Sequence, residues 1–109
     1  MSLLASLFGG PDINDAVAEA RATDGAVLID VRTPGEFAEG HIEGAVNIPL
    51  DRIGHALVAP TPAAPLFVYC ASGARSDRAC RELARRGYTA ARNIGGIGRW
   101  RGPVVTGAR

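Results

Sequence analysis

The sequence contains no lysine and only two cysteines: all twelve basic residues among its 109 are arginine. Two cysteines are too few for the disulfide framework of a small secreted domain. No apolar run approaches the roughly 18 residues that a membrane-spanning helix needs. The sequence also has no CxxC pair and no cluster of His and Cys of the kind that binds zinc. We therefore expect one soluble, cytoplasmic domain with no membrane span, no metal and no cofactor.

Basic residues are scarce in the first part of the chain and concentrated in the last part. Residues 1–69 hold three arginines against nine acids, whereas residues 70–109 hold nine arginines against two acids. The two parts carry −6 and +7, which give the net charge of +1. A total charge near zero argues against a nucleic-acid partner. The basic part suits a small anionic ligand or an acidic carrier protein, unless its arginines are only solvated.

Short apolar runs alternate with helical patterns, which predicts βαβ units and a parallel sheet. We expect an apolar extension (1–10) that forms a short docked helix, a single domain (11–105) and a tail (106–109). The expected strands are residues 12–13, 26–31, 45–48, 66–69 and 88–92. The expected helices are residues 14–21 with Asn14 as N-cap, a short helix between a capping box at Thr33 and Gly40, and residues 51–57 and 76–86. This order predicts an α/β fold: a five-stranded parallel sheet with helices on both faces.

Cys70 follows the apolar run 66–69, at the end of a strand where open parallel sheets bind their ligands. The next four residues are small, and Gly73 can take a positive φ, so the backbone can curl and turn several N–H groups toward the sulfur. A helix follows at once, and its dipole also stabilises an anion. These features lower the pKa of a thiol, which makes Cys70 a candidate thiolate nucleophile. The alternative is an inert, buried cysteine.

Four segments carry motifs in a fixed order: LIDVRTPGEF (28–37), GHIEGAVNIP (40–49), YCASGARS (69–76) and NIGGIGRW (93–100). They resemble the DVR…E(F/Y), GHIxGAxNIP, CxxGxRS and GGxxxW motifs of the rhodanese-like domain family, in particular of single-domain rhodaneses, which are thiosulfate sulfurtransferases. The resemblance covers about residues 12–105 and implies the rhodanese-like fold. It also implies that Cys70 takes a sulfane sulfur from a donor such as thiosulfate. The sulfur would be held as a Cys70 persulfide and passed to cyanide, a small thiol or a protein thiol.

The resemblance also implies roles for the residues around Cys70. The loop that holds substrate and persulfide would consist of Ala71, Ser72, Gly73, Ala74 and Arg75. From their positions along the chain we expect Asp30, Arg32, His41 and Ser76 to form a structural network under the loop rather than to transfer protons, and we expect Arg99 and Trp100 at the rim of the site. Arg75 either orients the donor or ties the loop to acidic residues. Cys80 falls on the apolar stripe of the next helix, so we expect it to pack in the core.

Two other functions share this fold. Related phosphatases and arsenate reductases have a loop longer by one residue, with Arg six positions after Cys, whereas Arg75 is five positions after Cys70. Rhodanese-like interaction or regulatory modules often lack the cysteine, which is present here.

The segment 100–104 is shorter than the family pattern, which puts its path in question. The oligomeric state is not predicted.

Overall fold

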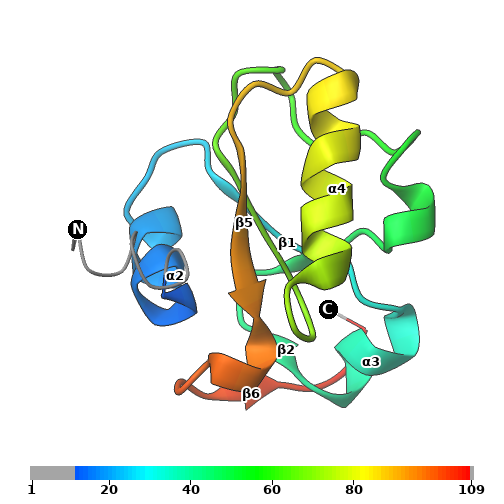
Figure 1. Ribbon diagram of the computed structural model, residues 1–109. Coiled ribbons are helices and arrows are strands. Elements are labelled where there is room, and N and C mark those ends of the chain that lie inside the picture. The colour runs from blue at the N-terminus through cyan, green and yellow to red at the C-terminus, as the bar shows by residue number, and fades with distance from the viewer. Residues whose placement is uncertain (1–11, 109) are drawn as a thin grey trace.

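The chain folds around a small parallel sheet that is covered by helix on both faces (Figure 1). The computed structural model describes residues 12–108. The strands lie side by side in the order β3, β1, β4, β5, and every neighbouring pair is parallel. Their bounds are β1 (Val27–Asp30), β3 (Val46–Asn47), β4 (Leu66–Cys70) and β5 (Ala91–Gly96). The helices are α2 (Ile13–Arg21), α3 (Pro34–Glu39) and α4 (Ala74–Arg85), with the 3-10 turns η1 (Leu50–Arg52) and η2 (Ile97–Arg99).

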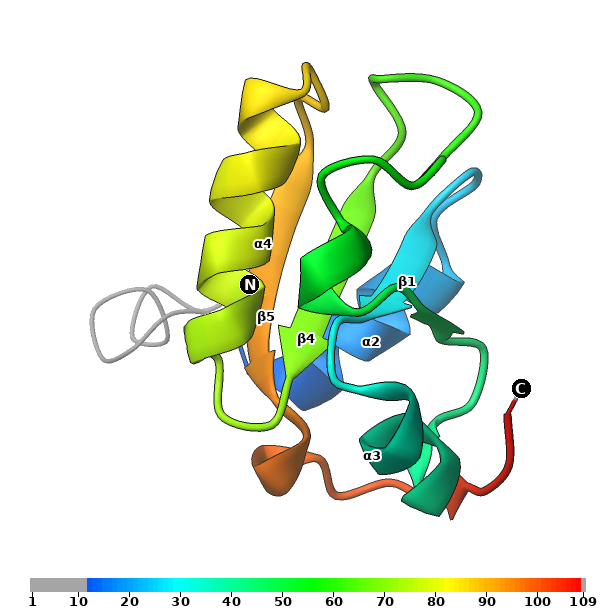
Figure 2. The same ribbon diagram turned by 90° about the vertical axis from the view of Figure 1, so that its right-hand side faces the viewer.

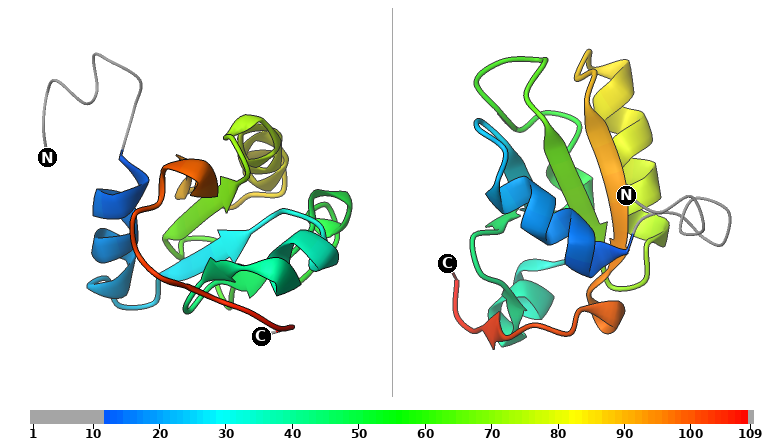
Figure 3. Two further views of the ribbon diagram at one scale, coloured as in Figure 1. Left: turned by 90° about the horizontal axis from the view of Figure 1, so that it is seen from below. Right: turned by 90° about the vertical axis from the view of Figure 1, so that its left-hand side faces the viewer.

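The central strand β4 is buried along its whole length because side chains point alternately into two cores. Phe67 and Tyr69 pack with the apolar face of α2. Leu66, Val68 and Cys70 pack on the other side with α4. Figure 3 shows α2 and α4 on opposite sides of the sheet. The continuous apolar run in the sequence therefore marks a strand that is covered on both faces of an α/β sheet, as we expected.

The expected strand at residues 12–13 is wrong. Asp12 is the N-cap of α2, and its side chain accepts a hydrogen bond of 2.8 Å from the Asn14 backbone N–H. Aspartate and asparagine cap helices about equally well, so the sequence did not separate a helix that begins at Ile13 from one that begins two residues later. The parallel sheet therefore has four strands rather than five.

A second, two-stranded sheet was not expected. β2 (His41–Ile42) pairs antiparallel with β6 (Val104–Val105), which brings the end of the chain back beside α3. The turn after Trp100 is tight, because a Cβ added at Gly102 would lie 2.3 Å from the indole ring. This turn gives the shortened segment 100–104 its path.

Two elements lie elsewhere along the chain than the sequence predicted. The last strand was expected at residues 88–92, but β5 runs over Ala91–Gly96. Tyr88 is used to end α4: its N–H donates to the Leu83 carbonyl at 3.0 Å, after Gly87 with φ +94°. The helix expected at 51–57 is only the single turn η1, directly after Pro49.

The expected docked helix at residues 1–10 lies outside the described residues. Within residues 12–108, no helix is long and apolar enough to cross a membrane. The same part of the chain contains no group of three or more His, Cys, Asp or Glu side chains that could hold a metal ion. The capping box is confirmed: the Thr33 hydroxyl accepts from Glu36 N–H, and the Glu36 carboxylate accepts from Thr33 N–H.

Candidate functional site

The loop after β4 turns into α4 at the carboxyl end of the parallel sheet (Figure 2), and Cys70 is the last residue of β4. Gly73 is the N-cap of α4 and has φ +107°, the left-handed conformation that the sequence led us to expect. Its N–H donates a hydrogen bond of 3.0 Å to Cys70 Sγ. The loop is therefore arranged to stabilise negative charge on this sulfur.

The two cysteines have opposite electrostatic surroundings. Burial by itself raises the pKa of the Cys70 thiol, but hydrogen bonds from Ser76 and from the backbone N–H groups of Gly73 and Ser72 outweigh it and hold that pKa below its ordinary value. Burial and the neighbouring charge of Asp77 raise the pKa of Cys80 to about 11. Cys80 also packs against the core on the α4 side, as expected. Cys70 is therefore the more nucleophilic thiol at neutral pH.

Ser76 and Asn93 form a network beneath the sulfur. The buried Ser76 hydroxyl lies 3.3 Å from Cys70 Sγ, 3.1 Å from Gly73 O and 2.7 Å from Asn93 Oδ1. The hydroxyl has one proton, so it can donate to one of these acceptors at a time. Asn93 in turn donates from Nδ2 to Gly73 O at 3.0 Å and accepts from Gly95 N–H. This network fixes the position of Gly73, and with it the N–H that faces the sulfur.

Strand β5 passes directly against the cysteine loop. A Cβ added at Gly96 would lie 2.3 Å from the Ala71 carbonyl oxygen and 2.6 Å from Ser72 Cα. Two residues further along the chain, the Gly98 N–H donates a hydrogen bond to the same Ala71 carbonyl at 3.4 Å. The glycines of the GGxxxW segment therefore let the backbone approach the loop more closely than any side chain would allow.

Arg75 turns toward α3 and forms a two-point ion pair with Glu36, with N–O distances of 2.7 and 3.0 Å. Hydrogen bonding from Arg75, together with the Thr33 backbone N–H, lowers the pKa of Glu36 to about 2. Of the two roles that the sequence left open for Arg75, this geometry supports tying the loop to an acidic residue.

The buried charged pair Asp30 and Arg32 lies at the end of β1. Their side chains form a salt bridge of 2.8 Å, and Arg32 also donates to Gly40 O at 2.7 Å. Asn47 donates to the carbonyl oxygens of both charged residues. His41 follows Gly40 in the chain and is buried, and its Nδ1 lies 2.8 Å from Phe37 O. The pair links the end of β1 to β3 and to the residue before β2. The expected support of the cysteine loop by Asp30, Arg32 and His41 remains a prediction.

The segment expected at the rim is held by α2. Asn14 Nδ2 donates to Arg99 O, and Asn14 Oδ1 accepts from Arg101 N–H. The Trp100 indole donates to Pro103 O at 3.0 Å, and the ring lies 5.8 Å from the Arg21 guanidinium carbon. Trp100 therefore packs toward α2. The expected contact of Arg99 and Trp100 with a substrate remains a prediction.

Sequence reasoning did not single out Asn93 or the partnership of Glu36 with Arg75. Both involve contacts between distant parts of the chain. A weak signal was available for Asn93. Asparagine is uncommon in strands, so an asparagine in one suggests that its side chain makes specific hydrogen bonds.

Comparison with known proteins gives this geometry a context. A family model of the rhodanese-like domain matches residues 14–102. The chain is 41% identical over 80 residues to "Uncharacterized protein YqhL" of Bacillus subtilis, covering 72% of this chain and 64% of that protein. It is 38% identical over 79 residues to "Sulfurtransferase" of Allochromatium vinosum (72% of this chain, 74% of that one). It is 37% identical over 71 residues to "Thiosulfate sulfurtransferase PspE" of Escherichia coli (63% and 68%).

Solved structures agree with the sequence comparisons. A rhodanese with anions from E. coli matches with a TM-score of 0.70 and 36% identity, over 75% of this chain and 99% of that one. The human single-domain sulfurtransferase matches with a TM-score of 0.73 and 30% identity, over 84% and 96%. The motifs, the four-stranded sheet with its cysteine loop, and these relatives lead to one assignment: the chain belongs to the rhodanese-like domain family.

Proposed function

We propose that the protein is a sulfurtransferase that carries a sulfane sulfur on Cys70. The Cys70 thiolate attacks the outer sulfur of a donor such as thiosulfate. An S–S bond forms to Cys70, the S–S bond of thiosulfate breaks, and sulfite leaves with the electron pair. The acceptor then attacks the outer sulfur of the persulfide, and Cys70 leaves as a thiolate. Cyanide becomes thiocyanate in this step, and a thiolate becomes a persulfide.

The observation that carries this proposal is the arrangement of donors around one sulfur. Gly73 N–H lies 3.0 Å from Cys70 Sγ, and the Ser76 hydroxyl lies 3.3 Å from it. The reaction keeps a negative charge on sulfur throughout, first on the thiolate and then on the outer sulfur of the persulfide. Donors that are already in place stabilise such a charge without rearranging during the reaction. Relatives named thiosulfate sulfurtransferase support the same chemistry.

The phosphatase alternative finds less support. A tetrahedral oxyanion needs several donors around it, and an arginine side chain folded over the loop would supply two. Here the Arg75 guanidinium is engaged by Glu36 at 2.7 and 3.0 Å. A purely regulatory module remains the second candidate, and the complete cysteine loop argues against it.

The proposal predicts the partners of the site by their chemistry. The donor is a small anionic sulfur compound, and the acceptor is a thiophile: cyanide, a small thiol or a protein thiol. Negative charge on the donor suits the basic part of the sequence that contains Cys70.

The test is thiocyanate formation from thiosulfate and cyanide. We expect turnover by the unmodified protein, none by Cys70→Ser, and near-normal turnover by the matched variant Cys80→Ser. Hydrolysis of a generic phosphate ester is measured in parallel. Cys70-dependent hydrolysis of the ester without thiocyanate formation would contradict the proposal in favour of the phosphatase. A folded protein with neither activity would favour the module.

A further inference from the structure

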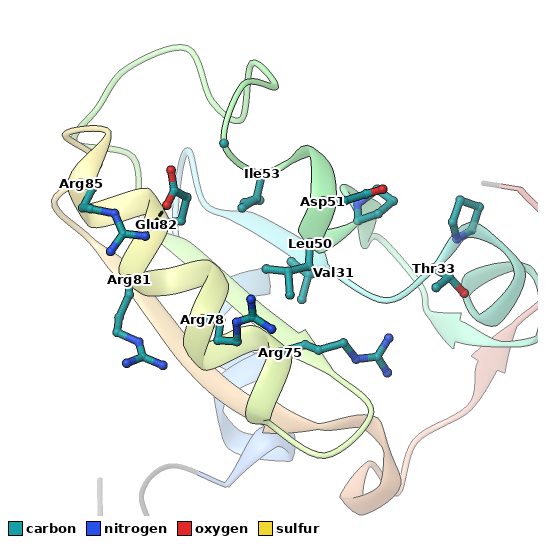
Figure 4. A pocket seen from close by; sticks show the side chains of 13 residues that line it. Val31, Thr33, Leu50, Asp51, Ile53, Arg75, Arg78, Arg81, Glu82 and Arg85 are labelled. Atoms are coloured by element: carbon teal, nitrogen blue, oxygen red, sulfur yellow. Dashed lines mark hydrogen bonds and ion pairs between the residues drawn. The ribbon is translucent and has the colours of Figure 1, made fainter.

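A groove of about 760 Å³ lies beside the cysteine loop, between α4 and the segment that follows β3 (Figure 4). Cys70 does not line it. Its lining includes Val31, Leu50 and Ile53, together with Arg75, Arg78 and Arg85 of α4. Its size is that of a site for a ligand or a short peptide.

The groove has an apolar floor that continues the core around the active cysteine. Val31 and Ile53 are each 1% exposed and belong to the same packed cluster as Cys70. Leu50 packs on this cluster from the surface. The apolar surface that a ligand can contact here is therefore mainly that of the partly buried Leu50, with Pro34 and Pro49 also lining the groove.

The groove starts at the cysteine loop and runs along α4. Arg75, the last residue of the loop, lines one end, and Arg85 lines the other. Ten residues of helix at about 1.5 Å each span roughly 15 Å. An extended peptide covers that distance with about four to five residues at about 3.3 Å each. A thiol placed next to such a peptide would come to the end of the groove where the loop lies.

The wall formed by α4 has four arginines and two acids, and the arginines at its two ends are already paired with Glu36 and Glu82. Arg78 has no acidic partner among the described residues, and Figure 4 shows its guanidinium turned toward Leu50 and Val31. Arg81 pairs with Asp77 at 3.0 Å, but both side chains are more than half exposed. Exposed pairs of this kind contribute little, so such an arginine can exchange its partner for a carboxylate of a ligand at small cost.

From these observations we infer that the groove docks an acidic, apolar segment of the thiol protein that accepts sulfur from Cys70. The basic wall matches carboxylates, the floor matches leucine-like side chains, and the groove leads to the loop. This inference rests on the proposed function and names the class of its acceptor. In the transfer, the acceptor thiol loses its proton to solvent, and its thiolate attacks the outer sulfur. The new S–S bond forms on the acceptor as the bond to Cys70 breaks.

The test uses the full chain loaded with thiosulfate and two synthetic acceptors. In one peptide, three glutamates alternate with two leucines beside a terminal cysteine; in the other, lysines replace the glutamates. Each is made with the cysteine at either end. The readout is the ratio of kcat/KM for the acidic peptide to that for the basic one, which cancels any general effect on persulfide formation. We expect a ratio of at least about ten, which corresponds to about 1.4 kcal/mol.

Arg78→Glu should bring this ratio to about one or below. Arg52→Glu makes the same change of charge at an exposed arginine of η1 that does not line the groove, and it should leave the ratio high. Equal use of both peptides by the unmodified protein, or an equal effect of the two variants, would overturn the inference.

Failure of the proposed function gives a different result, namely no thiocyanate from thiosulfate and cyanide. The groove is then tested by binding alone, with a fluorescein-labelled acidic peptide that carries serine in place of cysteine. Binding that Arg78→Glu weakens about tenfold and Arg52→Glu does not would support the docking surface without the chemistry. Absence of binding would overturn it.

Discussion

Gly96 of β5 lies so close to the cysteine loop that one added methyl group tests the geometry of the site. A Cβ at this position would come within 2.3 Å of the Ala71 carbonyl oxygen, whereas Cβ atoms essentially never lie closer than 3.0 Å to such a neighbour. In Gly96→Ala, the strand and the loop must therefore move apart by at least 0.7 Å. Gly96 itself has φ −120°, an extended conformation that alanine also adopts, so the effect is purely steric.

The size of the effect follows from what has to move. Both neighbours of the new methyl group, Ala71 O and Ser72 Cα, are backbone atoms and cannot rotate away. Overpacking of this kind costs about 1–3 kcal/mol, which lowers Tm by about 4–13 °C in a domain of this size. Displacement of the loop also moves the Gly73 N–H away from Cys70 Sγ. Because misplacement by about 1 Å can cost up to about 100-fold in rate, we expect thiocyanate formation to fall about 10- to 100-fold.

The matched control is Gly98→Ala, two residues further along the same segment. A Cβ there would lie 3.7 Å from Ala71 O, an ordinary van der Waals distance. We expect this variant to keep both its Tm and its rate. A Gly96→Ala protein with unchanged Tm and activity, or a Gly98→Ala protein as damaged as Gly96→Ala, would refute the close approach of β5 to the loop.

Three further outcomes follow from the same structure. Ser76→Ala removes a hydrogen bond that lowers the pKa of Cys70. A hydrogen bond to a charged group contributes about 1.5–3 kcal/mol, and this bond is long, so we take the lower end of that range. Alkylation of Cys70 by iodoacetamide at pH 7 should therefore slow about tenfold. An unchanged rate would argue against this role of the hydroxyl. The pKa of Glu36 is about 2 in the folded chain against 4.5 normally, so its pair with Arg75 stabilises the fold above about pH 4.5, and this contribution is lost as the pH falls toward 2. The pair, whose side chains are about one third exposed, contributes at most about 1 kcal/mol. Glu36→Gln should therefore reduce Tm slightly at pH 7 and much less near pH 2, and an equal reduction at both pH values would contradict the assignment. Arg32→Ala leaves the buried Asp30 carboxylate without its cation, which costs about 3–5 kcal/mol. Chemical denaturation should therefore show a larger loss of stability for this variant than for the others. A loss below about 1 kcal/mol would contradict the buried pair.

The parts of the molecule that the sequence predicted correctly are governed by neighbouring residues. The β4–loop–α4 unit follows from an apolar run, a cysteine and small residues in succession. The capping box at Thr33 and Glu36 spans three residues and was read directly. Local signals of this kind need no knowledge of the rest of the fold.

The incorrect parts depend on contacts that a linear pattern does not contain. The pairing of β2 with β6 joins residues about sixty positions apart in the sequence, and two-residue strands carry no periodicity. The start of β5 moved because Tyr88, a good strand residue, is used to end α4. The expected strand at 12–13 failed because Asp12 caps α2 instead. In the site, the Asn93–Ser76 bond and the Arg75–Glu36 pair connect different elements, so only the structure brings these residues together.

In the proposed reaction, Cys70 carries a transferable sulfur atom. This can be tested by the intact mass of the protein after incubation with thiosulfate and removal of excess donor. We expect a gain in mass of one sulfur atom, which disappears when cyanide is added and which persists in Cys80→Ser. The gain should be absent in Cys70→Ser. An unmodified protein that remains at its original mass after this treatment, or a Cys70→Ser variant that still gains the sulfur, would rule out a persulfide on Cys70.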